Sequence, residues 1–365
     1  MMSPQANTNN IIITMPASSH NCSNKEGTCA SRDHMECNGN APVSKNPIDL
    51  SENLEFWMTR LPLKLQTLPI IQLAIPGSHN SMTYTIEPGN DIGPDETPSI
   101  QMLGRCLSIL MRPIVFNWSV NQEISVREQL DGGIRYLDLR VAVKTSEDKI
   151  YFLHGLYGAE ISQPLQDVAD WLSTHPNEII ILDFQHFYKF NYQHHASLIE
   201  FIKQVFGRKL CPVFNKLDHL SLQWLNKEAY QVFVIYRNIA ARNYNYLWPS
   251  GAWSTPWPNT VNTSTLVNFL NESLQARDPR IGYVSQCLLT PNAAYVIKHI
   301  CGNLHRDLCP KCRKVTLSWI KKHAPGNGGM NIVITDFVSL DNFIFSKTVI
   351  QRNMQLLYPA ISCNN

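Results

Sequence analysis

The sequence predicts an α/β fold in which parallel strands form a barrel, and three observations support this prediction. Short apolar runs, each long enough for one buried strand, alternate with segments that have the apolar spacing of helices. The runs end in polar residues, as expected where the carboxyl ends of parallel strands meet at one face of a barrel. The chain has 365 residues, of which 44% are hydrophobic, which suits one barrel-sized domain with a tail.

The first 50 residues differ in composition from the rest of the chain. They are rich in Ser, Asn, Pro, Gly and charge, and they contain too little apolar surface to offset the entropy lost on ordering. We therefore expect a disordered polar tail at 1–50 and a single folded domain at 51–365, without an internal repeat or a second linker.

The charge balance argues against binding to nucleic acid. The chain has 31 basic and 29 acidic residues and a net charge of +2, so no strong field would attract a polyanion. The amino terminus lacks the basic and apolar regions of a secretory signal. The most apolar window, at 107–116, contains Arg112 and Pro113 and is far shorter than the ~20 residues of a membrane-spanning helix. These features predict a cytoplasmic protein without a transmembrane segment.

The first strand is expected at 70–75, where Pro76-Gly77 should end it. His79 follows at once. Loops at strand ends hold reactive groups on a rigid base, so this position suits chemistry. A purely structural histidine is the alternative interpretation.

Two helices are expected next. An apolar segment at 100–111 is interpreted as a helix packed on the core, with insertion into a membrane as the alternative. At 125–130, Ser125 and Glu128 have the spacing of a capping box, and Gly132 and Gly133 should end that helix.

The second strand, at 134–141, carries charged residues on one face. Side chains alternate along a strand, so Leu137, Leu139 and Val141 share one face and Tyr136, Asp138 and Arg140 share the other. In a barrel the apolar face meets the outer helices, which leaves Asp138 and Arg140 pointing inward. A structural ion pair and a functional role are both open at this point.

The remaining strands repeat this pattern. A third strand at 150–153 ends in His154, and the last one, at 331–337, has Asp336 near its end. Further strands are expected at 178–186, 231–237 and 283–286, with a helix at 164–175 between the third and fourth strands. The aromatic stretch from Trp248 to Trp257 is interpreted as buried packing, with contact to a sugar or to lipid as the alternative.

The ten cysteines are expected to be reduced thiols, because no secretory route is indicated. Cys309 and Cys312 have the spacing of half a zinc site, with Cys301 and His305 upstream, but no second pair completes it. The segment around them reads as a loop, and free thiols are favoured over a metal site.

The strand ends together offer a set of groups for acid–base chemistry. Two histidines can act as general base and general acid, because a pKa near 6.5 allows one to be neutral and the other protonated. An arginine can pair with two phosphate oxygens, and an aspartate can fix the tautomer of a histidine. This set suggests cleavage of a phosphodiester by an internal hydroxyl.

Four segments carry a resemblance to a known family: IPGSHNS, REQLDGGIRYLDLRV, YFLHGLYG and NEIIILDFQHFY, in this order. With these segments the chain resembles the X domain of phosphatidylinositol-specific phospholipases C, and most of all the small animal proteins that contain only this domain. The resemblance extends from Trp57 to the end of the chain. It implies a distorted TIM (β/α)8-type barrel and a phosphoinositide substrate, met by peripheral contact with a membrane surface.

The resemblance also implies roles for individual residues. His79 matches the general base that deprotonates the inositol 2-hydroxyl, and His154 matches the general acid that protonates the departing diacylglycerol oxygen. Asp336 falls where the bacterial enzymes keep the carboxylate partner of the base, and Asp138 falls where they keep an acid beside the phosphate. Arg237 aligns loosely with an arginine that binds inositol.

Calcium is not expected as a cofactor. The large eukaryotic enzymes of the family hold calcium with four residues at the positions of Asn80, Asp138, Arg140 and Gln185. Here Arg140 brings a positive charge and Gln185 removes an anionic ligand, which disfavours a calcium site. The bacterial enzymes have an arginine at the position of Arg140, so a metal-independent mechanism is predicted, with Asn80 and Gln185 contacting substrate instead.

Two other functions remain open. The substitutions at Asn80 and Gln185 could indicate a module that binds inositol lipid heads or a partner without turnover. A related barrel phosphodiesterase that acts on another lipid ester is the second alternative, although such enzymes need several acids around a metal.

Overall fold

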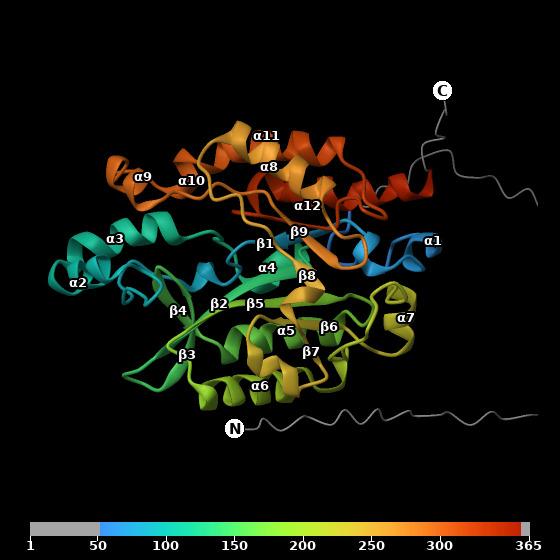
Figure 1. Ribbon diagram of the computed structural model, residues 1–365, viewed down its shortest axis with the longest axis horizontal. Helices are drawn as coiled ribbons and strands as arrows, with labels where there is room; N and C mark the ends of the chain where they lie inside the picture. Colours follow the sequence, from blue (N-terminus) through green and yellow to red (C-terminus); the bar gives the residue numbers. More distant parts are fainter. Residues whose placement is uncertain (1–51, 359–365) are drawn as a thin grey trace, which may run out of the picture. The chain divides into compact units, whose positions relative to one another are not determined.

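The computed structural model describes residues 52–358, except for the side chains of residues 104 and 105, so the predicted tail at 1–50 lies outside the described residues. Eight strands lie parallel in the order β7-β6-β5-β2-β1-β10-β9-β8 (Figure 1). They are β1 (Ile75–Ser78), β2 (Tyr136–Lys144), β5 (Ile180–Tyr188), β6 (Val232–Tyr236), β7 (Leu247–Trp248), β8 (Trp253–Ser254), β9 (Gly282–Gln286) and β10 (Ile332–Thr335). The predicted α/β fold with parallel strands is confirmed.

The barrel is open on one side. Strands β7 and β8 stand at the two ends of the strand order, and within residues 52–358 no ladder joins them. The rings of Trp248 and Trp253 meet edge to face across this gap, with centroids 5.5 Å apart. Both rings are buried, as predicted, but Trp257 at the end of the same aromatic stretch is 54% exposed, so the prediction of buried packing was wrong for that residue.

Helices pack around the outside of the barrel. In Figure 1, α8, α11 and α12 lie above the strands and α5 and α6 lie below them. The helices are α1 (Leu63–Gln66), α2 (Pro98–Cys106), α3 (Ser108–Ser119), α4 (Val126–Asp131), α5 (Ser162–Thr174), α6 (Tyr192–Phe206), α7 (Leu222–Lys227), α8 (Thr263–Gln275), α9 (Ala293–Lys298), α10 (Leu304–Asp307), α11 (Cys309–Lys322) and α12 (Leu340–Arg352). Among them, none has both the length and the apolar character of a membrane span.

The alternation of side chains along β2 divides the core as predicted. Leu137 and Leu139 belong to the apolar layer between the sheet and the helices. Tyr136 belongs to a second layer that gathers inward-facing residues of the neighbouring strands, among them Ile181, Phe233 and Ile334. Asp138 and Arg140 share the face of Tyr136.

The predicted first strand was wrong in its bounds. Residues Ile70–Gln72 form a 3₁₀ helix, and β1 begins only at Ile75 and includes Pro76 and Gly77. Short apolar runs do not distinguish a buried strand from a buried turn. Pro76 is tolerated because its missing N–H is not needed: Ile75 N donates to Asn331 O, and Pro76 O accepts from Arg135 N. His79 still follows the strand directly.

The third predicted strand is not part of the barrel. Strand β3 (Lys149–His154) pairs antiparallel with β2, and β4 (Leu156–Glu160) pairs antiparallel with β3. Because β2 runs out of the barrel mouth and β3 runs back toward it, the end of β3 returns His154 to the mouth.

Two local predictions were also wrong. The segment at Cys309–Cys312 is the first turn of α11 rather than a loop, since Pro310 is tolerated at a helix start. Both thiols are buried and free. The apolar segment at 100–111 is split between α2 and α3, and most of its apolar side chains, among them Met102, Ile109 and Leu110, are exposed rather than packed on the core. The capping box at Ser125 and Glu128 is confirmed.

Gly77 is expected to be intolerant of any side chain. A Cβ at this position would lie 2.8 Å from Ile334 Cγ2 and 2.9 Å from Tyr136 Cβ. We expect Gly77→Ala to lower the free energy of unfolding by ~1–3 kcal/mol, as measured by urea denaturation. The control is Gly89→Ala, where a Cβ would meet no atom within 4 Å. Equal stability of the two variants would contradict the close approach of β1 to its neighbours.

Candidate active site

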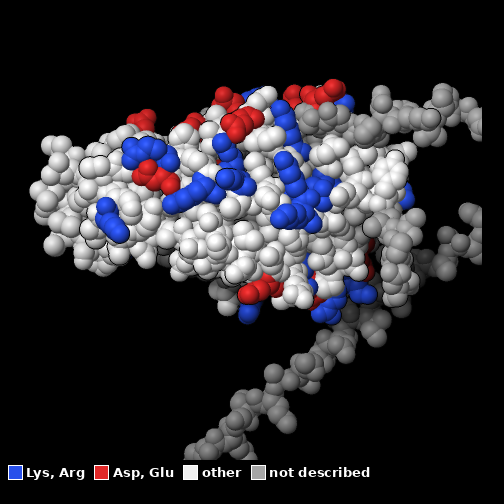
Figure 2. All heavy atoms as spheres, turned by 90° about the horizontal axis from the view of Figure 1, so that it is seen from above, with Lys and Arg blue, Asp and Glu red and all other residues white. Residues whose placement is uncertain are grey.

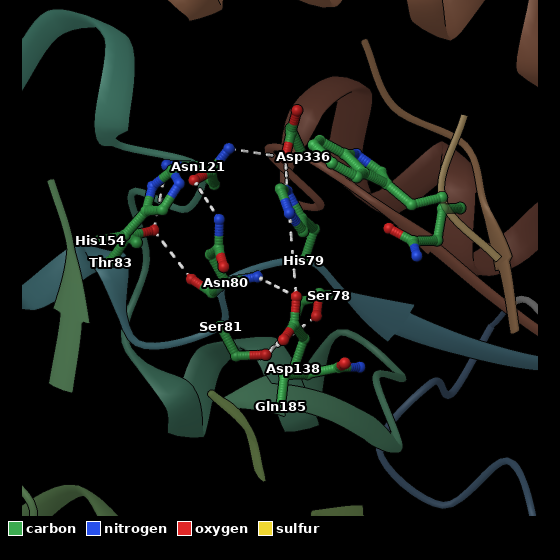
Figure 3. Close-up of polar contacts among 12 residues, drawn as sticks. Ser78, His79, Asn80, Ser81, Thr83, Asn121, Asp138, His154, Gln185 and Asp336 are labelled. Carbon is green, nitrogen blue, oxygen red and sulfur yellow. Dashed lines mark hydrogen bonds and ion pairs between the residues drawn. The ribbon is translucent and has the colours of Figure 1, made fainter. Parts of the chain in front are cut away.

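His79 lies between two buried carboxylates at the mouth of the barrel (Figure 3). Its Nδ1 is 2.7 Å from Asp336 Oδ1, and its Nε2 is 3.8 Å from Asp138 Oδ2. A carboxylate oxygen accepts hydrogen bonds, so Nδ1 carries the proton of a neutral ring. The Nε2 atom therefore keeps its lone pair available for a proton.

The parallel register brings these three residues together. Ser78 is paired with Thr335 of β10 on one side and with Leu137 of β2 on the other. The residues that follow these paired positions are His79, Asp336 and Asp138. These three candidates therefore lie side by side. His79 N also donates to Thr335 O at 3.1 Å.

His154 is held by a backbone carbonyl. Its Nδ1 lies 2.7 Å from the carbonyl oxygen of Ser119 at the end of α3. Because a carbonyl can only accept, Nδ1–H is the donor here as well, and Nε2 is free for chemistry. The rings of His79 and His154 have centroids 6.2 Å apart with an angle of 70° between their planes. The structure thus brings the two predicted histidines together.

His154 is neutral in the free protein. Burial of the ring, and then the positive charge of Arg140, lower the pKa of His154 from 6.5 to about 3. The hydrogen bond to Ser119 opposes this shift but does not reverse it.

Arg140 keeps its guanidinium available for a ligand. Among the described residues it forms no hydrogen bond or ion pair, and its Nε is buried without a partner. Asn80 Oδ1 and Asp138 Oδ1 are likewise buried and unpartnered, and all three residues line one small hollow. This hollow has a poor donor set for calcium, because it offers two oxygens beside a guanidinium.

The segment after α3 supports the site in a way that the sequence analysis missed. Asn121 Nδ2 donates to Asp336 Oδ1 at 2.9 Å, and Asn121 Oδ1 accepts from Asn80 Nδ2 at 2.9 Å. Gln122 Nε2 donates to the carbonyl oxygens of His79 and Thr335, both at 3.0 Å. The sequence signal that could have revealed this support is the amide pair Asn121-Gln122, which follows an apolar helix.

Asp95 is a second residue that the sequence analysis did not consider. Its Oδ2 accepts the backbone N–H of Gly155 at 2.7 Å, directly after His154. Burial raises the pKa of Asp95, while this hydrogen bond and the charge of Arg140 oppose the shift. Asp95 is thus an acid close to His154 and Arg140.

Gln185 and Arg237 belong to a hydrogen-bonded cluster around Asp183 inside the barrel, close enough to Asp138 for its charge to act on Asp183 and Arg237. Arg237 Nε and Nη2 donate to the two oxygens of Asp183 at 2.8 and 2.7 Å. Gln185 Nε2 donates to Tyr136 Oη at 3.1 Å and to Asp183 Oδ2 at 3.2 Å. Neither forms a hydrogen bond with a histidine of the site. Gln185 falls at an irregularity where the pairing of β5 with β2 shifts, which the sequence does not reveal.

The sequence is similar to a group of animal proteins. A family model described as PI-PLC X 1 matches residues 115–200. The mouse PI-PLC X domain-containing protein 2 is 39% identical over 300 residues, which cover 81% of this chain and 87% of that protein. The human PI-PLC X domain-containing protein 3 is 33% identical over 312 residues, which cover 85% and 95% of the two chains.

Bacterial enzymes share the fold. A mutant of the phosphatidylinositol-specific phospholipase C from Staphylococcus aureus matches with a TM-score of 0.57 at 16% identity, covering 83% of this chain and 98% of that one. The phosphatidylinositol-specific phospholipase C from Listeria monocytogenes matches with a TM-score of 0.54 at 18% identity, covering 82% and 98%. At these identities the likeness shows a common fold.

Arg140→Gln is expected to raise the pKa of His154, because the guanidinium charge is the main cause of its low value after burial. An NMR titration of the imidazole signals would measure the shift. The matched control is Arg306→Gln, which removes an exposed guanidinium paired with Asp307 and should leave His154 unchanged. If Arg140→Gln also left the pKa of His154 unchanged, Arg140 would not act on this ring.

Proposed function

Because the chain belongs to the family of PI-PLC X domain-containing proteins, we propose that it is a phosphoric diester hydrolase of the phospholipase C type. It would cleave phosphatidylinositol or a phosphoinositide to diacylglycerol and an inositol phosphate through a cyclic intermediate. The observation that carries this proposal is the pair of facing histidines, each with Nδ1 anchored and Nε2 free, beside an uncommitted guanidinium.

The reaction assigns one proton transfer to each histidine. His79 Nε2 takes the proton of the inositol 2-hydroxyl, and the oxygen forms a bond to phosphorus. The bond from phosphorus to the diacylglycerol oxygen breaks, and His154 Nε2 protonates that oxygen. Asp336 stabilises the imidazolium that forms on His79, through the contact at Nδ1.

Because the pKa of His154 is low, this ring can act as the general acid only if bound substrate changes the charge around it. A phosphodiester anion bound to Arg140 would offset the guanidinium charge that lowers the pKa of His154. The pKa of the ring would then rise and His154 could act as the acid. Proton uptake is therefore expected to accompany substrate binding.

The mechanism would use Arg140 where the calcium-dependent relatives use a metal ion. A guanidinium binds two phosphate oxygens and stabilises negative charge on them. Asn80 Oδ1 and Asp138 Oδ1 line the same hollow as Arg140, and the positive charge of the guanidinium disfavours calcium there. Within this proposal no metal is needed.

A second candidate is binding of inositol lipid head groups without turnover. The low pKa of His154 favours it, because a neutral ring cannot protonate a leaving group. In either case the ligand is a membrane lipid, so we propose that the protein is cytoplasmic and acts by peripheral contact with membrane surfaces.

His79→Ala and His154→Ala are each expected to reduce hydrolysis of phosphatidylinositol vesicles by roughly 10²- to 10⁴-fold, because each removes one proton transfer. Release of diacylglycerol would be measured. The matched control is His219→Ala, which removes an exposed ring and should be as active as wild type. Lipid binding without turnover in wild type would favour the binding module.

Excess EGTA is expected to leave the hydrolysis of phosphatidylinositol vesicles unchanged, because Arg140 would take the place of a metal ion. The rate would be measured with EGTA and again after calcium is added in excess. Activity that is lost in EGTA and restored by calcium would contradict the metal-independent mechanism while leaving the phospholipase assignment in place.

A further inference from the structure

Asp95 is an acid beside the candidate active site that the proposed reaction does not use. Figure 2 shows charged side chains at the surface of the face formed by α8 and α11, where water and salt screen them. Asp95 differs from such groups, because its Oδ1 is buried and has no partner among the described residues. Burial of a carboxyl oxygen costs free energy, so an acid at this position indicates a specific contact.

Residues 90–95, which we call the strap, lie along the start of β4. Tyr157 N donates to Asp91 O at 3.0 Å, and Ile92 forms an antiparallel bridge with Leu156. The strap lies between β1 and α2 in the chain. It therefore pairs with the hairpin of β3 and β4 like an additional short strand.

Gly155, at the turn of this hairpin, is held through both of its backbone groups. Its N–H donates to Asp95 Oδ2 at 2.7 Å, and its carbonyl oxygen accepts from Gly93 N at 2.7 Å. Gly155 has a φ of +67°, which other residues rarely adopt. A Cβ at this position would also collide with the side chain of Ser119 on α3. The strap thus fixes an unusual backbone conformation that is packed against α3.

The same contacts define where His154 lies. Gly155 follows His154 directly, so a shift of the Gly155 backbone would move His154 with it. The ring is tied at one further point, where Nδ1 donates to Ser119 O at 2.7 Å. A ring that is held at one nitrogen and at its backbone has one orientation relative to His79, which lies beside it in Figure 3.

The hydrogen bond of Asp95, rather than its charge, is the contact that the structure defines. A role through charge needs a carboxylate, whereas a role through the N–H of Gly155 needs only an acceptor oxygen. Among the described residues, no hydrogen bond joins Asp95 to His154 or to Arg140. The geometry therefore favours a role through the backbone of Gly155.

We propose that Asp95 is a positioning residue for His154. It accepts the N–H of Gly155 and so holds His154 in the place from which Nε2 protonates the leaving group. Asp95 itself transfers no proton. The positioning stands on the contacts of the strap, whereas the protonation step rests on the proposed function.

Two substrates with different leaving groups test this role. The diacylglycerol oxygen of phosphatidylinositol must be protonated as it leaves, whereas the 4-nitrophenyl ester of myo-inositol 1-phosphate releases 4-nitrophenolate, a stable anion that needs no proton. Asp95→Ala is expected to lower hydrolysis of phosphatidylinositol vesicles roughly 10- to 100-fold, because His154 is misplaced. Hydrolysis of the nitrophenyl ester should change by less than about threefold, because this reaction does not need the general acid. A residue needed only for folding would affect both substrates equally.

Two further variants serve as controls. Asp95→Asn is expected to keep both activities within about fivefold of wild type, since the amide oxygen can still accept the N–H of Gly155. Asp91→Ala, in the same strap, removes an exposed carboxylate that pairs with Arg112, and it should hydrolyse both substrates as wild type does. Urea denaturation would confirm that the variants are folded.

The NMR signals of the imidazole rings report the positioning without turnover. Asp95→Ala is expected to shift the signals of His154 more than those of His79. Asp95→Asn and Asp91→Ala should leave the signals of both rings close to their wild-type positions.

The proposal is overturned if Asp95→Ala lowers both activities equally, or if Asp95→Asn is as impaired as Asp95→Ala. It is also overturned if the His154 signals do not move in Asp95→Ala. If wild type cleaves neither substrate, the proposed function fails, and the NMR signals alone then decide whether Asp95 positions His154.

Discussion

The parallel register of β10, β1 and β2 decides where the candidate chemistry of this protein lies. It places Asp336, His79 and Asp138 one residue beyond paired positions on three adjacent strands. The backbone N–H of His79 donates to Thr335 O, and Asp138 O accepts from Ser81 N, so these strand ends are tied to one another rather than to flexible loops. Close packing at Gly77 is the condition for this register, because the space for a side chain there is taken by its neighbours.

His154 lacks such support, since it ends a hairpin strand outside the barrel. The stretch from Ser119 to Gln122 supplies it. This stretch holds His154 through a carbonyl oxygen, Asp336 through an amide of Asn121, and the backbone of His79 through Gln122. One short segment therefore fixes the relative position of both rings, although they come from parts of the fold with different pairing.

The sequence predicted those parts of the site that follow from position along a strand. His79, Asp138 and Asp336 could be found because apolar runs mark strands and polar residues mark their ends. The hydrogen bonds of Gln185 and Arg237 to Asp183 could not be predicted, because they depend on the irregular pairing of β5 and on a buried carboxylate that no local pattern marks. The support by Asn121 was hidden for a similar reason, since a hydrogen bond to Asp336 spans 215 positions of sequence and leaves no local pattern. The exposed side chains of α2 and α3 were misjudged because an apolar composition is the same for a helix in a core and for one at a surface.

The open side of the barrel has a mechanical consequence. In a closed barrel, any change of diameter breaks a ladder of backbone hydrogen bonds. Within residues 52–358, β7 and β8 are two-residue strands that no ladder joins, and the rings of Trp248 and Trp253 meet across the gap. The seam between β7 and β8 is therefore closed by side chains: the two rings pack edge to face, and Arg237 Nη2 donates to Trp253 O at 3.1 Å. A substitution at these side chains would loosen the barrel without breaking a ladder of backbone hydrogen bonds.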